Sequence, residues 1–181
     1  MSVPEHVEYR RCAVQRQTLA GAVPLSGMAR LAAAVHRLPH QQAQLQLAFV
    51  EDDQRRVRVA GRVVAPVQLL CQRCSTAFVY EVDTAVAGVV VADDAAAATV
   101  PHADEPILAA GDMLDIHALV EDELLLALPM VVICDNPACR TRYNASAPQQ
   151  QTEPSPARRR TDNPFAVLEK LKHDNDTTDS N

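Results

Sequence analysis

Four cysteines fall into two closely spaced pairs, a pattern typical of metal ligands. Two residues separate Cys71 from Cys74, and four separate Cys134 from Cys139. Pairs spaced by two to four residues are the usual arrangement in tetrahedral zinc sites. Four thiolates would complete the coordination shell and leave no open position for a reaction, so the spacing predicts one structural Zn²⁺. The alternative is that the cysteines are free thiols, or pairs too far apart to share an ion.

The first pair also has the spacing of a thiol–disulfide oxidoreductase. That chemistry needs a helix that begins at the first cysteine and lowers its pKa. Residues 75–80 follow the pair here, and their alternation is typical of a strand. The context therefore disfavours redox catalysis at Cys71 and Cys74. Cys12 is the unpaired fifth cysteine, and a reducing compartment argues against structural disulfides.

An acidic run, Glu121-Asp122-Glu123, lies in the segment with the strongest helical pattern. Successive helical residues point in different directions, so the run is interpreted as a solvated helix face or a contact surface for a partner. An enzymatic alternative would need Asp112, Asp115, Glu121 and Glu123 to converge around Mg²⁺. The sequence has no glycine-rich phosphate loop and no Gly-x-Ser-x-Gly element. We therefore expect a protein that is not an enzyme and has no small-molecule substrate.

Charge is divided unevenly along the 181 residues. Residues 1–74 contain ten arginines and five acids, whereas residues 75–139 contain twelve acids and no lysine or arginine. Such a division indicates two complementary surfaces for partners, or two parts that neutralise each other in the fold.

Five arginines form a candidate basic stripe for RNA contact, because guanidinium groups bind phosphate in a bidentate manner. They are Arg55, Arg56, Arg58, Arg62 and Arg73. Aromatic residues make up only 3% of the chain, which leaves little material for stacking bases. The alternative is pairing of these arginines with neighbouring acids, namely Glu51, Asp52, Asp53 or Glu81.

Periodicity predicts the elements that position these groups. Alternating residues predict an edge strand over 18–23, a hairpin over 44–50 and 57–63, and further strands over 67–70, 78–82 and 86–91, with a brief one at 107–108. Ser26 is a candidate cap for a helix with apolar positions at Met28, Leu31, Ala32 and Val35. Residues 93–101 are expected to form a mobile loop. Asp115 can cap the longest helix, residues 115–128, whose apolar stripe comprises Ile116, Leu119, Val120, Leu124 and Ala127.

This order of elements predicts an α+β fold, with an antiparallel β-sheet built from hairpins, one long packed helix and an N-terminal helix. The domain is expected to cover residues 1–144. Residues 145–161 are predicted to be a disordered linker, 162–172 a tethered short C-terminal helix, and 173–181 a disordered tail. Three apolar positions of that short helix are candidates for partner contact, namely Phe165, Leu168 and Leu171.

The cellular compartment is expected to be the cytoplasm. The sequence has no run of roughly 18 apolar residues that could span a bilayer, and its start lacks the apolar core of a signal peptide. No membrane partner is therefore expected.

Four segments, taken in order, match the motifs of one known family. Residues 19–25 with Arg30-Leu31-Ala32 are similar to its strand–helix entry, and residues 70–74 to its cysteine knuckle. Residues 121–129 resemble its signature helix, and residues 162–168 with Leu171-Lys172 resemble its ending. Together the four segments resemble the YceD-like family, the large ribosomal RNA subunit accumulation proteins.

The resemblance implies a bacterial accessory factor that supports 23S rRNA synthesis, processing or accumulation, and thus large ribosomal subunit biogenesis. The implied partners are ribosomal RNA or large-subunit ribosomal proteins, the latter at the acidic run. It implies no catalytic residue, and the zinc site remains an inference from spacing. A zinc-ribbon-like protein-binding adaptor is the first alternative, and a metal-dependent RNA-processing enzyme is the second.

Overall fold

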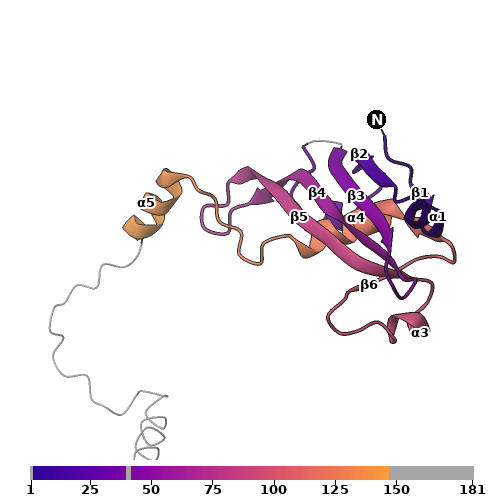
Figure 1. Cartoon of the computed structure of the whole chain (residues 1–181). Helices are drawn as coiled ribbons and strands as arrows, with labels where there is room; N and C mark the ends of the chain where they lie inside the picture. The colour runs from indigo at the N-terminus through magenta and orange to yellow at the C-terminus, as the bar shows by residue number, and fades with distance from the viewer. Residues whose placement is uncertain (1, 40–41, 147–181) are drawn as a thin grey trace, which may run out of the picture. The chain divides into compact units, whose positions relative to one another are not determined.

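The structure is a computed structural model that describes residues 2–39 and 42–146 (Figure 1). The chain divides into a compact unit, Met1–Asn144, and a second unit, Ala145–Asn181, most of which lies outside the described residues. The predicted linker from residue 147 on, the C-terminal helix and the tail therefore stay predictions. None of the helices in the described part combines the length and apolar character that a membrane crossing needs.

Strands make up most of the regular structure. They are β1 His6–Glu8, β2 Thr18–Pro24, β3 Gln42–Glu51, β4 Val57–Leu70, β5 Ala77–Val91, β6 Pro106–Leu108 and β7 Met113–Asp115. The helices are α1 Tyr9–Val14, α2 Ala29–Ala34, α3 Asp94–Ala97, α4 Ile116–Leu126 and α5 Pro137–Ser146. The α+β class is confirmed, and every range predicted as a strand lies in one. The ranges 57–63 and 67–70 form the single strand β4, and 78–82 and 86–91 form the single strand β5.

The main sheet has the order β2-β3-β4-β5-β6. The first four strands are antiparallel, and β2 is an edge strand as predicted. The predicted antiparallel sheet is confirmed for β2 to β5, whereas β6 pairs with β5 in parallel after the chain returns through α3. Pro66 is tolerated in the central strand β4 because it lies beyond Val64, the last residue of β4 that pairs with β3.

The core lies between one face of the sheet and α4, which crosses it (Figure 1). Leu45, Leu47 and Phe49 of β3 point into this core at every second position, as the alternation predicts. Four residues of the predicted α4 stripe are buried, namely Ile116, Leu119, Val120 and Leu124. The fifth, Ala127, is partly buried and packs against the core. The side chain of Asp115 accepts a hydrogen bond from the Ala118 amide at 2.9 Å, which confirms the predicted cap.

Two local predictions are wrong, and one short helix was missed. Ser26 does not cap α2, whose N-cap is Met28, and Ala32 is exposed. Residues 93–101 include the helix α3, capped by the Asp93 side chain, which accepts from the Ala96 amide at 2.7 Å. The short helix α1 was not predicted, although its buried residues Tyr9, Cys12 and Ala13 lie at helical spacing, because six residues are fewer than the window over which periodicity identifies a helix.

Candidate metal centre

The first cysteine pair lies in the tight connection between β4 and β5. The Cys71 amide donates to the Thr76 carbonyl at 3.0 Å, and the Ser75 amide donates to the Cys71 carbonyl at 2.8 Å. Ser75 has φ 57°, a left-handed conformation that reverses the chain. This turn brings the thiols of Cys71 and Cys74 to one side of the hairpin end.

The second pair reaches the same place from beyond α4. The Gln72 amide donates to the Val132 carbonyl at 2.8 Å and so ties the segment after α4 to the hairpin end. Cys134 follows that segment, and Cys139 lies in the first turn of α5. Asn136 caps α5 by accepting from the Ala138 amide at 2.9 Å.

The four thiols form one cluster. All four Sγ atoms lie within 4.8 Å of one another. The Cys71–Cys139 and Cys74–Cys134 Sγ distances are both 3.8 Å. Tetrahedral zinc with Zn–S bonds of about 2.3 Å separates its sulfurs by roughly 3.8 Å, so this donor set fits the ion.

Hydrogen bonds and burial tune the four thiols differently. The Cys134 amide, 3.4 Å from the Cys71 Sγ, is the main cause that lowers the pKa of Cys71 to about 6. The hydroxyl and amide of Thr76 lower the pKa of Cys74. Burial raises the pKa of Cys139 to about 11, although the Arg73 Nε lies 2.9 Å from its sulfur. Amide and guanidinium donors at the sulfurs are the kind of second shell that supports bound thiolates.

The acidic run on α4 is tied to the start of α2. Glu121 is only 8% exposed. Its Oε1 accepts from the amides of Arg30 and Leu31 at 2.8 and 3.1 Å, and its Oε2 accepts from the Arg30 Nε and Nη2 at 3.0 and 2.8 Å. The Arg30 Nη1 donates to the Asp122 Oδ1 at 2.6 Å. Glu121 therefore supplies the cap that Ser26 does not, and its carboxylate is engaged within the protein.

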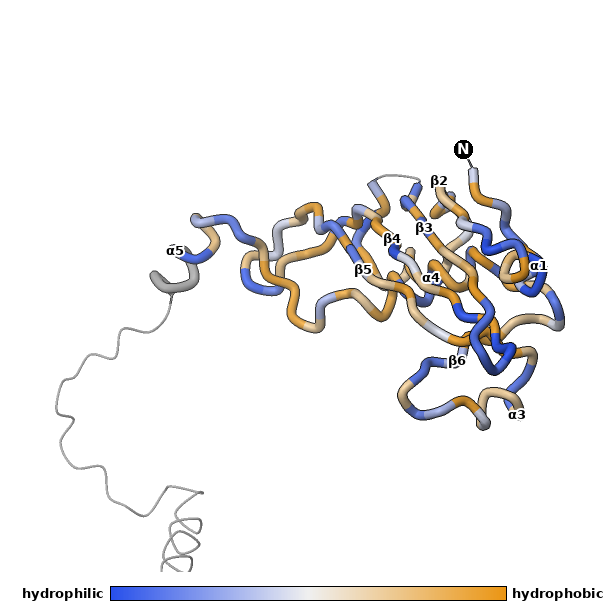
Figure 2. The backbone as a smooth tube through the Cα atoms, viewed as in Figure 1, coloured by the Kyte–Doolittle hydropathy of each residue, from blue (hydrophilic) through white to orange (hydrophobic). Residues whose placement is uncertain are grey.

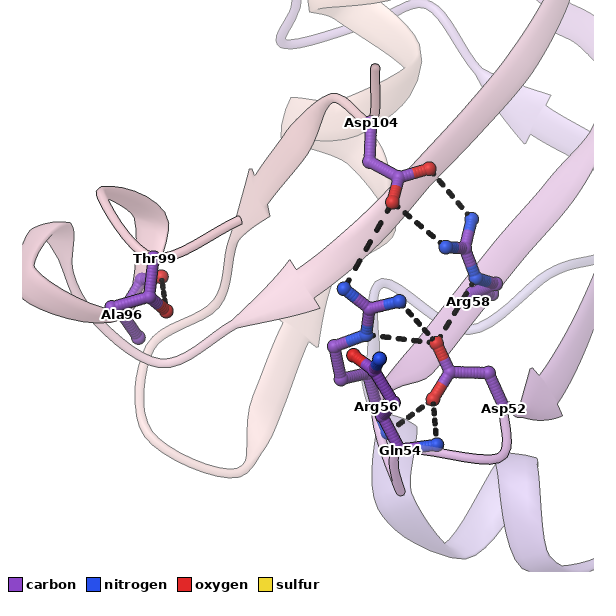
Figure 3. A network of polar contacts seen from close by, with 7 residues as sticks. All are labelled: Asp52, Gln54, Arg56, Arg58, Ala96, Thr99 and Asp104. Atoms are coloured by element: carbon purple, nitrogen blue, oxygen red, sulfur yellow. Dashed lines mark hydrogen bonds and ion pairs between the residues drawn. The ribbon is translucent and has the colours of Figure 1, made fainter. Parts of the chain in front are cut away.

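The predicted arginine stripe is largely paired with acids. Asp52 accepts from the amide and the Nε of Arg56 at 2.9 and 2.8 Å, and from the Arg58 Nε at 3.2 Å (Figure 3). The two terminal nitrogens of Arg58 donate to Asp104 at 2.8 Å each (Figure 3). These bonds join the turn between β3 and β4 to the segment that precedes β6. Of the acids weighed from the sequence, Asp52 is a partner, whereas Asp104 comes from a distant segment.

The remaining arginines of the stripe lie apart from that network. Arg62 pairs with Asp83 across β4 and β5. Arg73 belongs to the cysteine cluster. Arg55 occupies the β3–β4 turn with φ 59° and forms no salt bridge with the described residues.

The sequence is similar to one known protein family over most of its length. The sequence model of the family described as "Large ribosomal RNA subunit accumulation protein YceD" matches residues 59–172. A Haemophilus influenzae protein with the name "Large ribosomal RNA subunit accumulation protein YceD" is 32% identical over 174 residues, which cover 95% of this chain and 97% of the relative. This chain belongs to the YceD family. No solved structure gives a significant match to it.

Two of the motifs that suggested the YceD family are in direct contact, and a third is part of the cysteine cluster. Arg30, from the strand–helix entry, bonds to Glu121 of the signature helix, and the cysteine knuckle is completed by Cys134 and Cys139. The fourth motif, with Phe165, Leu168 and Leu171, lies outside the described residues. Sequence reasoning missed α5, although Asn136-Pro137 places a capping residue directly before a proline at the first helical position.

The acids of the enzymatic alternative do not converge in this YceD-family chain. Asp112 pairs with Arg10 at 3.2 Å, Asp115 caps α4, and Glu121 binds Arg30. The cysteine cluster is the one group of potential metal ligands found among the described residues. A Mg²⁺ site built from Asp112, Asp115, Glu121 and Glu123 is therefore not supported.

The Asp52 network predicts a stability difference that depends on pH. Burial opposes ionisation of Asp52, but hydrogen bonds from the Arg56 and Gln54 amides and from two arginines outweigh it and lower the pKa to about 2. The unfolded value is about 3.9. A folded pKa below the unfolded one stabilises the fold fully at neutral pH, and this stabilisation is lost as pH falls from about 5 towards 2.

We expect Asp52→Asn to lower the melting temperature most at pH 7, and the difference from wild type to shrink steadily below pH 5. Thermal melting followed by circular dichroism in a series of buffers measures this difference. Asp53→Asn, at an exposed neighbour, is the matched control and should give a small, constant difference. A wild-type-to-variant gap that is constant between pH 7 and pH 3 would contradict the assignment.

Proposed function

We propose that this protein is a non-enzymatic, cytoplasmic accessory factor that supports accumulation of the large-subunit ribosomal RNA. The observation that carries the proposal is the 32% identity, over nearly the whole of both chains, to a relative named for that role. The separate pairing of the candidate catalytic acids is consistent with an accessory rather than an enzymatic role.

We further propose that the four cysteines hold one structural Zn²⁺. Their separations match those expected for a tetrahedral thiolate site, and no ligand position would remain for substrate. The ion would clip the β4–β5 hairpin end to the segment that leads into α5. Such a clip keeps two segments that are distant in sequence together as one surface.

A protein-binding adaptor is the second candidate, and the paired arginines favour it. Arg56, Arg58 and Arg62 each contact an aspartate, which reduces their capacity to bind RNA phosphates. Under this alternative the factor acts on large-subunit ribosomal proteins, through acids such as Asp122 and Glu123. Under direct RNA contact, Arg55 and Arg62 are the stripe residues best placed to reach a phosphate, because Arg55 has no acidic partner among the described residues and the Arg62 side chain is 65% exposed.

The test is depletion of the protein in cells, with the ratio of large- to small-subunit rRNA and a sucrose-gradient ribosome profile as readouts. We expect a selective fall in the large-subunit rRNA that wild-type protein restores. An unchanged ratio with a normal profile would refute the proposed function.

The same cells separate the two candidates. Complementation with an Arg55→Ala/Arg62→Ala variant should restore the ratio and leave RNA crosslinking to the protein unchanged if the factor acts as an adaptor. Loss of crosslinking together with the ratio would favour direct RNA contact.

A further inference from the structure

A groove of about 240 Å³ runs between the edge strand β6 and the helix α4. It is separate from the cysteine cluster and from the arginine stripe. Both of its walls come from the acidic part of the chain: Glu105, Pro106, Ile107, Leu108, Leu114, Asp115, Ala118, Leu119, Asp122, Glu123 and Leu126.

Exposed apolar side chains line the two walls. Leu108 on β6 is 56% exposed and Leu126 on α4 is 74% exposed. In the chain that leaves α4, much of which Figure 2 colours as hydrophobic, Met130 and Val131 are 95% and 64% exposed. Large apolar side chains exposed together in this way mark interaction sites more often than chance exposure does.

The β6 wall is an open sheet edge. The Val89 amide donates to the Glu105 carbonyl and the Ala109 amide donates to the Val91 carbonyl, each at 2.8 Å. The alternation of a parallel ladder therefore turns the N–H and C=O of Leu108 away from β5, towards the side where no further strand is paired. Gly88 on β5 allows β6 to pack closely against it, because an added Cβ there would lie 2.7 Å from the Ile107 Cδ1.

The rim of the groove is acidic, and only part of its charge is paired within the described residues. Glu105 and Glu123 take part in no salt bridge of the described residues, and Asp122 is paired with Arg30. Burial, and then the charges of Glu105 and Asp122, raise the pKa of Glu123. Residues 75–139 contain no lysine or arginine that could relieve this repulsion. A cationic ligand would relieve it, and RNA phosphates would be repelled.

We propose that this groove binds an extended, lysine- and arginine-rich polypeptide segment of a partner protein. The segment lies along β6, where its backbone pairs with Leu108 as an added strand. The cationic groups of the segment reach Glu105 and Glu123. The methylene stems of its lysine and arginine side chains cover Leu108 and Leu126. Recognition therefore combines an open strand edge, apolar contact and charge.

The biological meaning of this site rests on the proposed function. Proteins that bind RNA carry lysine and arginine to neutralise phosphates. A factor acting in large-subunit assembly would therefore meet such segments, and the groove could cover one before it reaches RNA. The binding chemistry of the groove can be measured independently of that role.

The test uses the purified full chain and a fluorescent peptide of roughly eight residues that alternates arginine or lysine with valine, a typical strand length. Fluorescence anisotropy measures the dissociation constant. Glu105→Gln/Glu123→Gln should weaken binding about tenfold, because two partly exposed ion pairs are lost. The control pair Asp53→Asn/Glu81→Gln removes the same charge from exposed positions outside the groove and should change binding less than about twofold.

Leu108→Ser tests the apolar wall without changing the charge of the protein. Because Leu108 is exposed, its replacement should not destabilise the fold. We expect several-fold weaker peptide binding. Equal weakening by the groove and control pairs would show unspecific charge attraction and overturn the proposal, as would tight binding of a single-stranded RNA probe that competes with the peptide. If the peptide does not bind but depletion lowers the large-subunit rRNA, only the groove proposal is refuted. If the peptide binds but depletion leaves the rRNA ratio unchanged, only the proposed function is refuted.

Discussion

We expect purified protein to contain about one zinc per chain, and a Cys71→Ser/Cys134→Ser variant to contain almost none. This is the largest effect that the structure predicts. Loss of even an outer-shell partner weakens metal binding roughly 10–100-fold, so loss of two direct ligands should exceed about 100-fold. Metal analysis of the full chain, together with competition against a coloured chelator, measures both quantities.

The structural consequence of metal loss should be local. Cys71, Cys134 and Cys139 form a small buried cluster of their own, separate from the main core between the sheet and α4. Chelation should therefore expose the β4–β5 hairpin end and the segment before α5 to protease, while the sheet persists. Cutting within residues 129–139, followed by mass spectrometry, reports this opening.

Cys12→Ala provides the matched control. Cys12 is also a buried cysteine, but it packs in the main core on α1 and is not part of the four-thiol cluster. Its replacement should leave zinc content unchanged. Protein that is free of metal yet resists protease to the same degree as the untreated chain would show that the four thiols need no ion.

Local patterns predicted much of the fold. Period-two alternation located β3, β4 and β5, because one face of each strand packs on the core. The helical period and the capping aspartate located α4. The spacing of the cysteines also predicted that the two pairs come together in one cluster, because pairs spaced in this manner are typical of zinc sites.

Long-range pairs limited the rest of the prediction. Asp104 binds Arg58 across 46 residues, so no local pattern reveals that this arginine of the stripe is paired. The parallel pairing of β6 likewise depends on how the preceding segment returns across the sheet. The cap of α2 is the clearest case, because Glu121 lies 91 residues from Arg30. A solvated acidic face and an internal cap have the same local sequence.

That internal cap leads to the second large prediction. Glu121→Ala would leave the amides of Arg30 and Leu31 without their acceptor at the start of a six-residue helix that has no local side-chain cap. Loss of a helix cap and of charged hydrogen bonds to a buried carboxylate costs about 3 kcal/mol of unfolding free energy. For a unit of this size the melting temperature should fall by roughly 10 °C.

Asp122→Ala separates this role from general loss of acidic charge on α4. Among the described residues, Asp122 bonds only to the exposed Arg30 guanidinium, so its removal should cost less than about 1 kcal/mol. Glu121→Gln should fall between the two, because one amide oxygen can still accept from the α2 amides while the charge is lost. Chemical denaturation of the three variants decides the matter. Equal destabilisation by Glu121→Ala and Asp122→Ala would mean that α4 contributes charge alone, and a large difference would establish Glu121 as the residue that locks α2 to α4.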